Sequence, residues 1–587
     1  MNTRFKSLQS IVLLTALLLI PRVHLLAEET RSLSDLERKI SAIYQQHFPV
    51  MLETSPDGAK LLLKDVRLEK FELSVMDLDS KQQVVIDLAN DSQIGPRWSH
   101  DGTRVAFYVD ERGDQRFRIK CANLRQRTVN VLGPEIQGLT KLSWSPDDKL
   151  FAYVSQVNGN RELMVTTTGP EAETRRIGAL AREGEYAWSP DSQTIAYVDG
   201  SDPLSLRLVE VRQNGAKADK SIAFDGEITA LNWSPDGSLL IAAVRPAAED
   251  FPRLMAFDVR TRTQRKLKVP VEGDISGVNF GSLNSRFIYT QSQQAERKVL
   301  LVDLAKETQL DLTPQAGVAG VLGFVSRSNR VFIAESKRFG MSTELKEFSL
   351  DGRAVRLRHR ATSGERSHIV SERLSPELAG GRRTQALLWR DERAPIGSRS
   401  LVIMVHGGPK LNYFQSWRPE LDALLQLGVD VLQLNYSGSS GYGAAYAAQL
   451  PHAVDDVVGT AEFAVTLGYK QRGIFLMGDS FGAGLALQAS GRLPDRIGGL
   501  ILFSFLGSAS GHGALPERTL VFHGANDPVA SPAAALSGLQ RFWRIDGGVE
   551  PTWWRIVNNE GHSFRRLQSW AAALAEVIKL IERPTAQ

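Results

Sequence analysis

The residues best suited to chemistry lie at 478–482, where the sequence reads Gly-Asp-Ser-Phe-Gly. The apolar run at 473–477 is typical of a buried strand, and the small residues at 483–490 are compatible with a helix. A serine in a sharp turn between a strand and a helix is presented for nucleophilic attack, and flanking glycines leave room for that turn. Because glycine and serine are also common in ordinary turns, Ser480 is a candidate nucleophile that needs partners elsewhere.

Downstream residues supply an acid and a base in the required order. A nucleophilic serine needs a base, and the base needs an acid that orients it. Residues 519–523 predict a strand that ends in a turn carrying Asp527, and residues 552–557 predict a later strand that runs out into His562. His562 is the only histidine after Asp527, so the order of serine, acid and histidine selects it. We expect Ser480, Asp527 and His562 to form a catalytic triad.

Ordinary structural roles would also suit these residue types. Asp527 precedes a proline, and aspartate favours such turn positions. His523 could be a core histidine that hydrogen-bonds the backbone, while His512 lies between two glycines in a predicted loop without an acid beside it. We prefer the triad because three motifs fall in order at three successive strand ends.

A fourth motif, His-Gly-Gly-Pro at 406–409, follows an apolar strand predicted at 400–405. A tetrahedral intermediate needs backbone N–H groups aimed at its oxyanion. We expect one donor from Phe481, the residue after the nucleophile. The other should come from Gly407, where the absence of a side chain allows close approach. A plain turn at the strand end is the alternative.

The N-terminal two thirds of the chain are repetitive. Trp-Ser-Pro-Asp or a variant of it recurs with the serine position at 55, 99, 145, 189, 234, 281 and 325, the last two being degenerate. This spacing of about 45 residues, with several short strands per repeat, is typical of a β-propeller, and seven repeats predict seven blades. We expect the aromatic residue to pack between blades and the Pro-Asp-Gly to form a β-turn.

Taken together, the motifs resemble the prolyl oligopeptidase family of serine peptidases, in the branch of acylaminoacyl peptidases and bacterial dipeptidyl peptidases or oligopeptidases. The resemblance lies in residues 406–409, 435–443, 455–456, 478–482, 523–528 and 560–562. It implies a two-domain fold, a seven-bladed β-propeller followed by a C-terminal α/β-hydrolase domain. It also implies hydrolysis of short peptides through an acyl-enzyme on Ser480, with the propeller restricting access and without a metal or organic cofactor.

Three features depart from the family pattern, and the mildest is Ala483 in place of the second glycine after the serine turn. Ser437 stands where members usually have arginine, which would weaken a structural salt bridge near the site. The interval of 47 residues from Ser480 to Asp527 is shorter than usual and omits a segment that normally shapes the substrate pocket. We therefore expect a more open pocket and assign no substrate-binding residues.

The length of 587 residues exceeds what one core supports. We divide the chain into a signal peptide at 1–27, an N-terminal helical segment at 28–50, the propeller at 51–362 and the hydrolase domain at 363–587. The leader has basic residues before an apolar run at 11–20 that is too short for a comfortable membrane span, although an uncleaved anchor is the alternative.

Composition points to an exported protein. Cys121 is the only cysteine, so no intrachain disulfide forms, and this suits a bacterial periplasmic or secreted protein. Removing residues 1–27 takes away three positive charges, so the net charge falls from +4 to +1. A net charge this small gives no indication of nucleic-acid binding. We expect no stable membrane span after cleavage, and the sequence does not indicate an oligomeric state.

Two other functions use the same sequence features. An esterase would have the same triad and differ only in substrate, although the propeller favours a peptidase. A propeller binding protein with a decayed hydrolase domain would not need the complete triad. Whether the cut is terminal or internal, and whether a free or acylated amino end is preferred, cannot be read from the residues.

Overall fold

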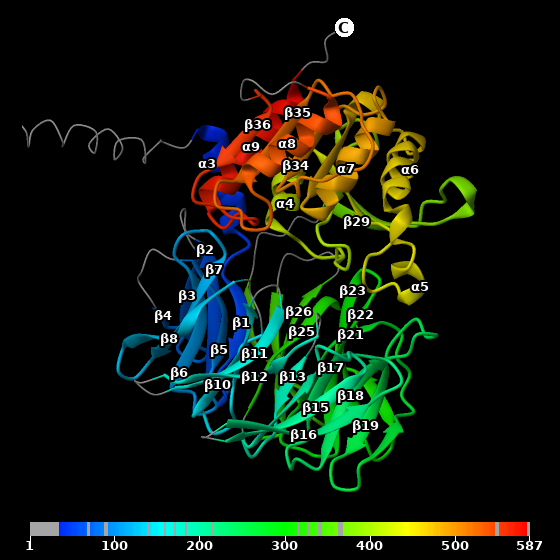
Figure 1. Ribbon diagram of the computed structural model, residues 1–587. Coiled ribbons are helices and arrows are strands. Elements are labelled where there is room, and N and C mark those ends of the chain that lie inside the picture. The colour runs from blue at the N-terminus through cyan, green and yellow to red at the C-terminus, as the bar shows by residue number, and fades with distance from the viewer. Residues whose placement is uncertain are drawn as a thin grey trace, which may run out of the picture.

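The computed structural model describes residues 34–583 except 67–70, 87–91, 138–140, 158–159, 169–171, 182–184, 213–214, 315, 326–327, 338–342, 362–367 and 546–550. The signal peptide expected at 1–27 lies outside the described residues and stays a prediction. The chain forms two domains, an α/β domain stacked on a ring of β-sheets (Figure 1). Among the helices described, none is long and apolar enough to cross a membrane.

The ring is the expected β-propeller, built from antiparallel strands in groups of four. In the described part of the chain, five four-stranded sheets are separate, and a larger sheet splits into two groups linked by a parallel bridge from β23 to β25. The groups follow the sequence repeats. They are β1 (Val50–Thr54), β2 (Lys60–Val66), β3 (Phe71–Asp77) and β4 (Gln83–Val85); β5 (Ser92–Trp98), β6 (Arg104–Asp110), β7 (Arg116–Asn123) and β8 (Thr128–Gln137); β9 (Ser143–Trp144), β10 (Leu150–Val157), β11 (Asn160–Thr167) and β12 (Thr174–Ala179); β13 (Tyr186–Trp188), β14 (Thr194–Val198), β15 (Ser205–Arg212) and β16 (Gly215–Ala223); β17 (Glu227–Trp233), β18 (Leu239–Arg245), β19 (Arg253–Asp258) and β20 (Thr263–Lys266); β21 (Asp274–Phe280), β22 (Arg286–Gln293), β23 (Glu296–Asp303) and β24 (Thr308–Asp311); β25 (Ala316–Phe324), β26 (Arg330–Lys337), β27 (Thr343–Ser349) and β28 (Ala354–Ala361).

The Ser-Pro-Asp motif forms the turn between the first two strands of a group. In the third group, Ser145 Oγ donates to Asp147 at 2.7 Å and accepts the N–H of Leu150 at 2.9 Å. The N–H of Asp148 donates to the carbonyl of Ser145 at 2.8 Å, which closes the predicted β-turn. The serine and aspartate side chains pair in the same way at positions 55, 99, 189 and 234.

The aromatic residue of the motif packs between neighbouring sheets, as expected. Trp144 joins Ala106 and Tyr108 of the preceding group in one core cluster, and its indole N–H donates to the carbonyl of Arg97 at 3.1 Å. The first and last groups of strands also share a core cluster, which contains Leu61 of the first group and Phe332 of the last. The ring is therefore held closed by apolar cores between adjacent sheets.

The second domain is an eight-stranded sheet with helices on both faces. Its order is β29-β30-β32-β31-β33-β34-β35-β36, antiparallel from β29 to β32 and parallel beyond. The core clusters place α6, α7 and α8 on one face and α4 and α9 on the other. The strands are β29 (Ile369–Leu374), β30 (Gln385–Asp391), β31 (Leu401–Val405), β32 (Asp430–Asn435), β33 (Ile474–Asp479), β34 (Gly499–Phe503), β35 (Thr519–Gly524) and β36 (Trp554–Val557), and the helices are α4 (Pro419–Gln426), α5 (Ala444–Ala447), α6 (Ala453–Thr466), α7 (Phe481–Arg492), α8 (Pro532–Trp543) and α9 (Leu567–Glu582).

An N-terminal helix, α3 (Asp35–Gln45), precedes the propeller in sequence but packs on the α/β domain. Ser34 and Glu37 form a capping box at its start. Ile40 and Ile43 on its apolar face share a core cluster with Leu567 of α9. The predicted helical segment is therefore joined to the C-terminal domain, and both ends of the described chain meet there.

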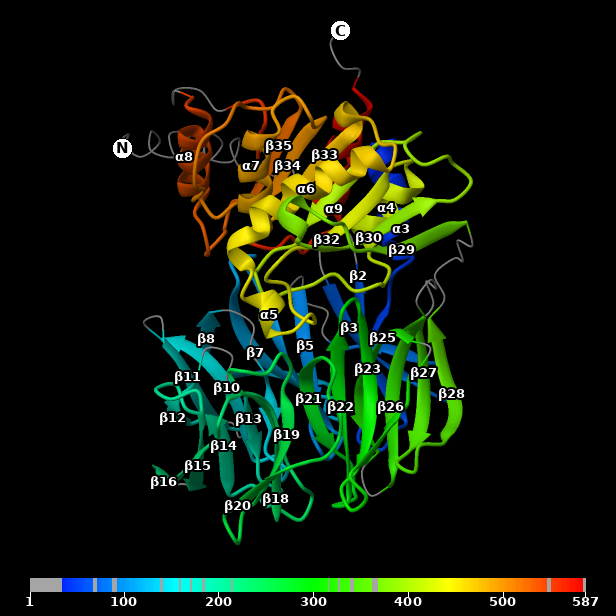
Figure 2. The ribbon, with the colours of Figure 1, turned by 90° about the vertical axis from the view of Figure 1, so that its right-hand side faces the viewer.

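The two domains lie one above the other (Figure 2), and polar contacts join them. Asp250 and Asp274 of the propeller accept the backbone N–H groups of Ala445 at 2.8 Å and Gly441 at 2.6 Å. On another blade, Asp110 forms an ion pair with Arg565, and both side chains are buried. The loops at the carboxyl ends of the parallel strands therefore face the propeller.

Candidate active site

Ser480 lies in a strained turn between β33 and α7. Its backbone has φ 52° and ψ −116°, a conformation that a residue other than glycine rarely adopts. A Cβ on Gly482 would lie 2.2 Å from the carbonyl oxygen of Val405, and one on Gly478 would lie 2.4 Å from that of Gly482. Both glycines of the motif are therefore required by the packing of the strand against the helix.

The structure brings Ser480, Asp527 and His562 together from three strand ends. Nε2 of His562 lies 2.8 Å from Oγ of Ser480, and Nδ1 lies 2.8 Å from Oδ2 of Asp527. The other carboxylate oxygen, Oδ1, accepts the backbone N–H groups of Val529 at 2.8 Å and Ala530 at 3.0 Å. Serine, imidazole and carboxylate thus form one hydrogen-bonded chain.

The environment keeps Asp527 ionised. Burial alone would raise the pKa of its carboxyl. The hydrogen bonds from His562 and from the N–H groups of Ala530 and Val529 lower this pKa by more than burial raises it, so the net shift is downward. An ionised carboxylate can hold the imidazole in one orientation and stabilise its protonated form.

Of the other two downstream histidines, His523 also lies beside the aspartate, with its Nε2 3.3 Å from Oδ2 of Asp527. His523 is fully buried, its Nε2 lies 2.8 Å from the carbonyl oxygen of Ala530, and its ring stacks on Trp554. Burial lowers the pKa of His523, which keeps it neutral. The alternative of a core histidine bonded to backbone therefore applies to His523, while His512 is exposed in the loop before β35.

Gly407 lies directly beside the nucleophile. A Cβ at this glycine would be 3.1 Å from Cβ of Ser480, so the backbone of the loop approaches the serine closely. His406 fixes the loop, because its Nε2 lies 2.8 Å from Oγ of Ser439 and its ring stacks on Tyr436. Phe481 is the first residue of α7, where a backbone N–H has no partner inside the helix. Both expected donors therefore lie next to the serine, one in a neighbouring loop and one as the next residue in the chain.

Ser437, which the family resemblance places at a usual arginine position, donates its backbone N–H to Oδ2 of Asp456 at 2.7 Å. Arg382, from the segment before β30, forms an ion pair with Oδ1 of the same aspartate at 2.9 Å. Asp456 therefore has a guanidinium partner from another segment of the chain. The expected weakening of a salt bridge by Ser437 stays a prediction.

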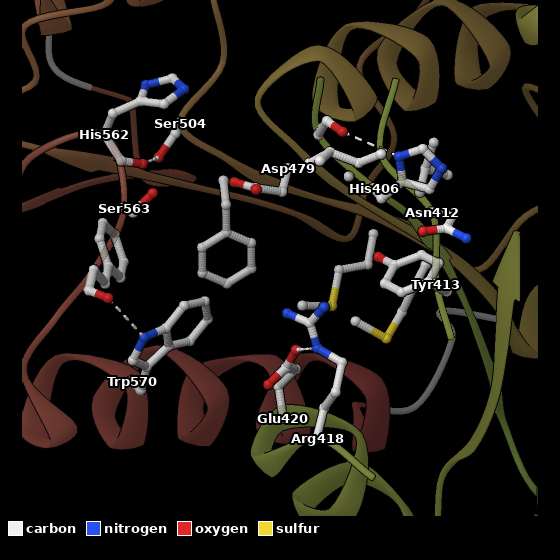
Figure 3. Close-up of a pocket in the computed structure, with 18 of the residues that line it drawn as sticks. His406, Asn412, Tyr413, Arg418, Glu420, Asp479, Ser504, His562, Ser563 and Trp570 are labelled. Carbon is white, nitrogen blue, oxygen red and sulfur yellow. Dashed lines mark hydrogen bonds and ion pairs between the residues drawn. The ribbon is translucent and has the colours of Figure 1, made fainter. Parts of the chain in front are cut away.

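A cavity of about 440 Å³ lies beside Ser480 at the carboxyl ends of β31, β33 and β34 (Figure 3). No motif in the sequence marks its position. Asp479, the residue before the nucleophile, projects between a wall carrying His562 and Trp570 and a wall carrying His406 and Tyr413. The pair Arg418 and Glu420 lines another side.

Asp479 is exposed to the cavity yet surrounded by protein. This burial raises the pKa of its carboxyl to about 6, although the charges of His562 and Arg418 act in the opposite direction. The carboxyl is therefore mainly ionised at neutral pH and becomes neutral in mild acid.

One propeller loop, residues 111–115, abuts the loop that carries the histidine. A Cβ on Gly113 would lie 2.3 Å from the carbonyl oxygen of Asn559. With its amide oxygen turned toward them, Gln115 accepts the N–H groups of His562 at 3.2 Å and Ser563 at 3.1 Å. The propeller therefore supports the position of the histidine loop. Sequence reasoning missed this contact because it joins residues about 450 positions apart.

Among the described residues, no group of three or more histidine, cysteine, aspartate or glutamate side chains could hold a metal ion.

Comparison with known proteins finds similar proteins for both parts of the chain. Residues 55–354 match the model of the TolB beta propeller domain family. Dipeptidyl-peptidase 5 of Porphyromonas gingivalis is 21% identical over 478 residues, which is 68% of this chain and 67% of that protein. The acylamino-acid-releasing enzyme of Mus musculus is 31% identical over 118 residues, which is 19% of this chain and only 16% of the mouse enzyme.

Solved structures share the fold over nearly the whole chain. A prolyl endopeptidase, from a study of inter-domain dynamics in two such enzymes, superimposes with a TM-score of 0.75 at 13% identity, covering 93% of this chain and 92% of that one. A puromycin-hydrolyzing peptidase of Mycobacterium tuberculosis gives a TM-score of 0.73 at 16% identity, covering 92% and 95%. At these identities the likeness concerns the fold.

Proposed function

Because this chain belongs to the TolB beta propeller domain family and shares its overall fold with prolyl oligopeptidases, we propose that it is a prolyl oligopeptidase-like serine peptidase acting on short peptides through Ser480. The observation that carries the proposal is the hydrogen-bonded chain from Ser480 through His562 to Asp527, with 2.8 Å at each step. The strained turn at Ser480 supports it independently.

In the proposed mechanism, Nε2 of His562 takes the hydroxyl proton while Oγ of Ser480 bonds to the peptide carbonyl carbon. Asp527 stabilises the imidazolium that forms. The backbone N–H groups of Gly407 and Phe481 stabilise the oxyanion. The C–N bond then breaks, and His562 gives its proton to the leaving amine. Water repeats the sequence on the acyl-enzyme and releases the acid.

Access to the site runs between the two domains. A second cavity, of about 570 Å³, is lined by Arg245, Asp274 and Arg297 of the propeller and by Asn412 and Phe414 of the α/β domain. The last two residues also line the cavity beside Ser480. A peptide that reaches the serine through this space has to be short or extended. We therefore propose that the propeller restricts the size of the substrates that reach Ser480.

The test is hydrolysis by the intact chain of chromogenic peptide amides with free or acylated amino ends, beside short acyl esters. We expect amide hydrolysis that Ser480→Ala abolishes. Turnover of esters alone would favour an esterase instead. If Ser480→Ala left all turnover unchanged, the catalytic role of the triad would be refuted and a binding role for the propeller would be favoured.

A further inference from the structure

The cavity beside Ser480 contains one negative charge in excess. Arg418 and Glu420 form an ion pair, so their charges cancel. The carboxylate of Asp479 makes no hydrogen bond or ion pair with any residue that the structure describes, and its surface faces the cavity. An ionised group of this kind in a partly desolvated space favours an incoming cation.

Aromatic rings form the wall that accompanies this carboxylate. Phe503, Phe564 and Trp570 line the cavity and contact one another, with ring centroids 5.4 to 5.9 Å apart. The indole N–H of Trp570 donates to the carbonyl of Phe564 at 3.1 Å, which fixes the ring (Figure 3). Aromatic faces together with a carboxylate are a recurrent arrangement for binding ammonium and guanidinium groups.

The carboxylate also lies close to the reacting atoms. A Cβ on Gly407 would be 3.2 Å from Oδ2 of Asp479 and 3.1 Å from Cβ of Ser480, so these groups surround one glycine. A cation bound to Asp479 would therefore sit next to the carbonyl that Ser480 attacks.

We propose that this cavity is a subsite for a cationic group of the substrate, either a free amino terminus or a lysine or arginine side chain adjacent to the cut bond, with Asp479 as its counter-ion. The inference rests on the proposed peptidase function and adds a substrate class to it. An anionic group is disfavoured, because the guanidinium of Arg418 is neutralised by Glu420 while Asp479 would repel the ligand.

Four amide substrates separate the two sources of the cation: lysine and norleucine aminomethylcoumarin amides, each with a free or an acetylated amino end. The readout is the ratio of kcat/KM for a cationic substrate to that for its neutral analogue, since effects on the chemistry at Ser480 cancel in this ratio. We expect Asp479→Asn to lower one of the two ratios about tenfold. This is the low end of the affinity loss that follows when one partner of a desolvated charge pair is removed. The lysine ratio reports a side-chain subsite, and the ratio of free to acetylated norleucine reports an amino-terminal one.

Asp495→Asn is the matched control, because Asp495 is an exposed carboxylate on the same domain. It should leave both ratios unchanged. Equal ratios in wild type and Asp479→Asn, with amide hydrolysis intact, would overturn the subsite while leaving the peptidase function in place.

A binding measurement tests the subsite without turnover. Benzylammonium and benzyl alcohol are titrated by calorimetry into the intact Ser480→Ala chain. We expect benzylammonium to bind more tightly, and the further change Asp479→Asn to weaken it about tenfold. Equal binding of the two probes, or benzylammonium binding unaffected by Asp479→Asn, would refute the proposal even if the chain had no peptidase activity.

Discussion

Serines and aspartates in turns serve different purposes in the two domains. In the propeller turn, Ser145 is fully buried, and its hydroxyl both donates to Asp147 and accepts the N–H of Leu150. In the α/β domain, Ser480 has a strained backbone, is partly exposed, and has its hydroxyl beside His562. The first hydroxyl has its hydrogen bonds satisfied by the turn itself, whereas the second lies beside a base.

The difference shows that residue type alone does not indicate chemistry. The turn aspartate holds a backbone in place, while Asp527 uses one oxygen for its own turn and the other for His562. What distinguishes the proposed catalytic set is a histidine from a distant strand and a backbone strain that the packing of β33 against α7 imposes.

The largest contrast is expected between the two aspartates. Asp527→Asn should lower kcat for amide hydrolysis about 10⁴-fold, because the amide cannot orient the imidazole or stabilise its charged form. Asp147→Asn should leave kcat within about twofold, since its oxygen still accepts the turn hydrogen bonds. Steady-state kinetics on both variants measures this. Similar losses of kcat in the two variants would contradict the distinction between the two turns.

The next effect crosses the domain boundary. Asp110→Ala should lower the free energy of unfolding by about 3 kcal/mol, because it leaves the buried guanidinium of Arg565 without its partner. It should also lower kcat, since Arg565 follows His562 by three residues. Thermal unfolding and kinetics check both effects, and Arg565→Met in the Asp110→Ala background should restore part of the stability. An unchanged melting temperature in Asp110→Ala would show that the pair does not hold the domains.

A smaller effect separates the two serines. Ser145→Ala should destabilise the propeller by about 1–2 kcal/mol, because the N–H of Leu150 loses its acceptor in a buried turn. Ser480→Ala should leave the melting temperature nearly unchanged while abolishing activity. An equal loss of stability in the two alanine variants, measured by thermal unfolding, would contradict the structural role of Ser145.

The smallest effect concerns pH. Of the two kcat/KM ratios, the one that Asp479→Asn lowers should fall a few-fold in the wild type as the pH drops through about 6, because protonation removes the negative charge of Asp479. The charged groups acting on Asp479 are Arg418, Glu420, His562 and Asp527. Any effect of pH on the chemistry at Ser480 is common to both substrates and cancels in the ratio. A ratio that stays constant between about pH 5 and 8 would contradict the assignment of Asp479 as counter-ion.

The sequence predicts much of this molecule because local motifs carry it. The repeat at Trp144 and its counterparts indicates the propeller, and the glycines around Ser480 indicate the turn, since each motif acts within a few residues. The contacts that were missed join distant segments. Arg382 reaches Asp456, Asp110 reaches Arg565, and Asp479 faces a cavity formed by five separate loops and helices. No local pattern marks such positions.

Chemical labelling shows whether Ser480 is the activated nucleophile. A fluorophosphonate is incubated with the intact chain and the modified peptide is mapped by mass spectrometry. We expect one adduct per chain, on Ser480, that His562→Ala strongly slows and Ser145→Ala does not. Labelling of another serine, or none at Ser480 under conditions in which the chain hydrolyses amides, would contradict it.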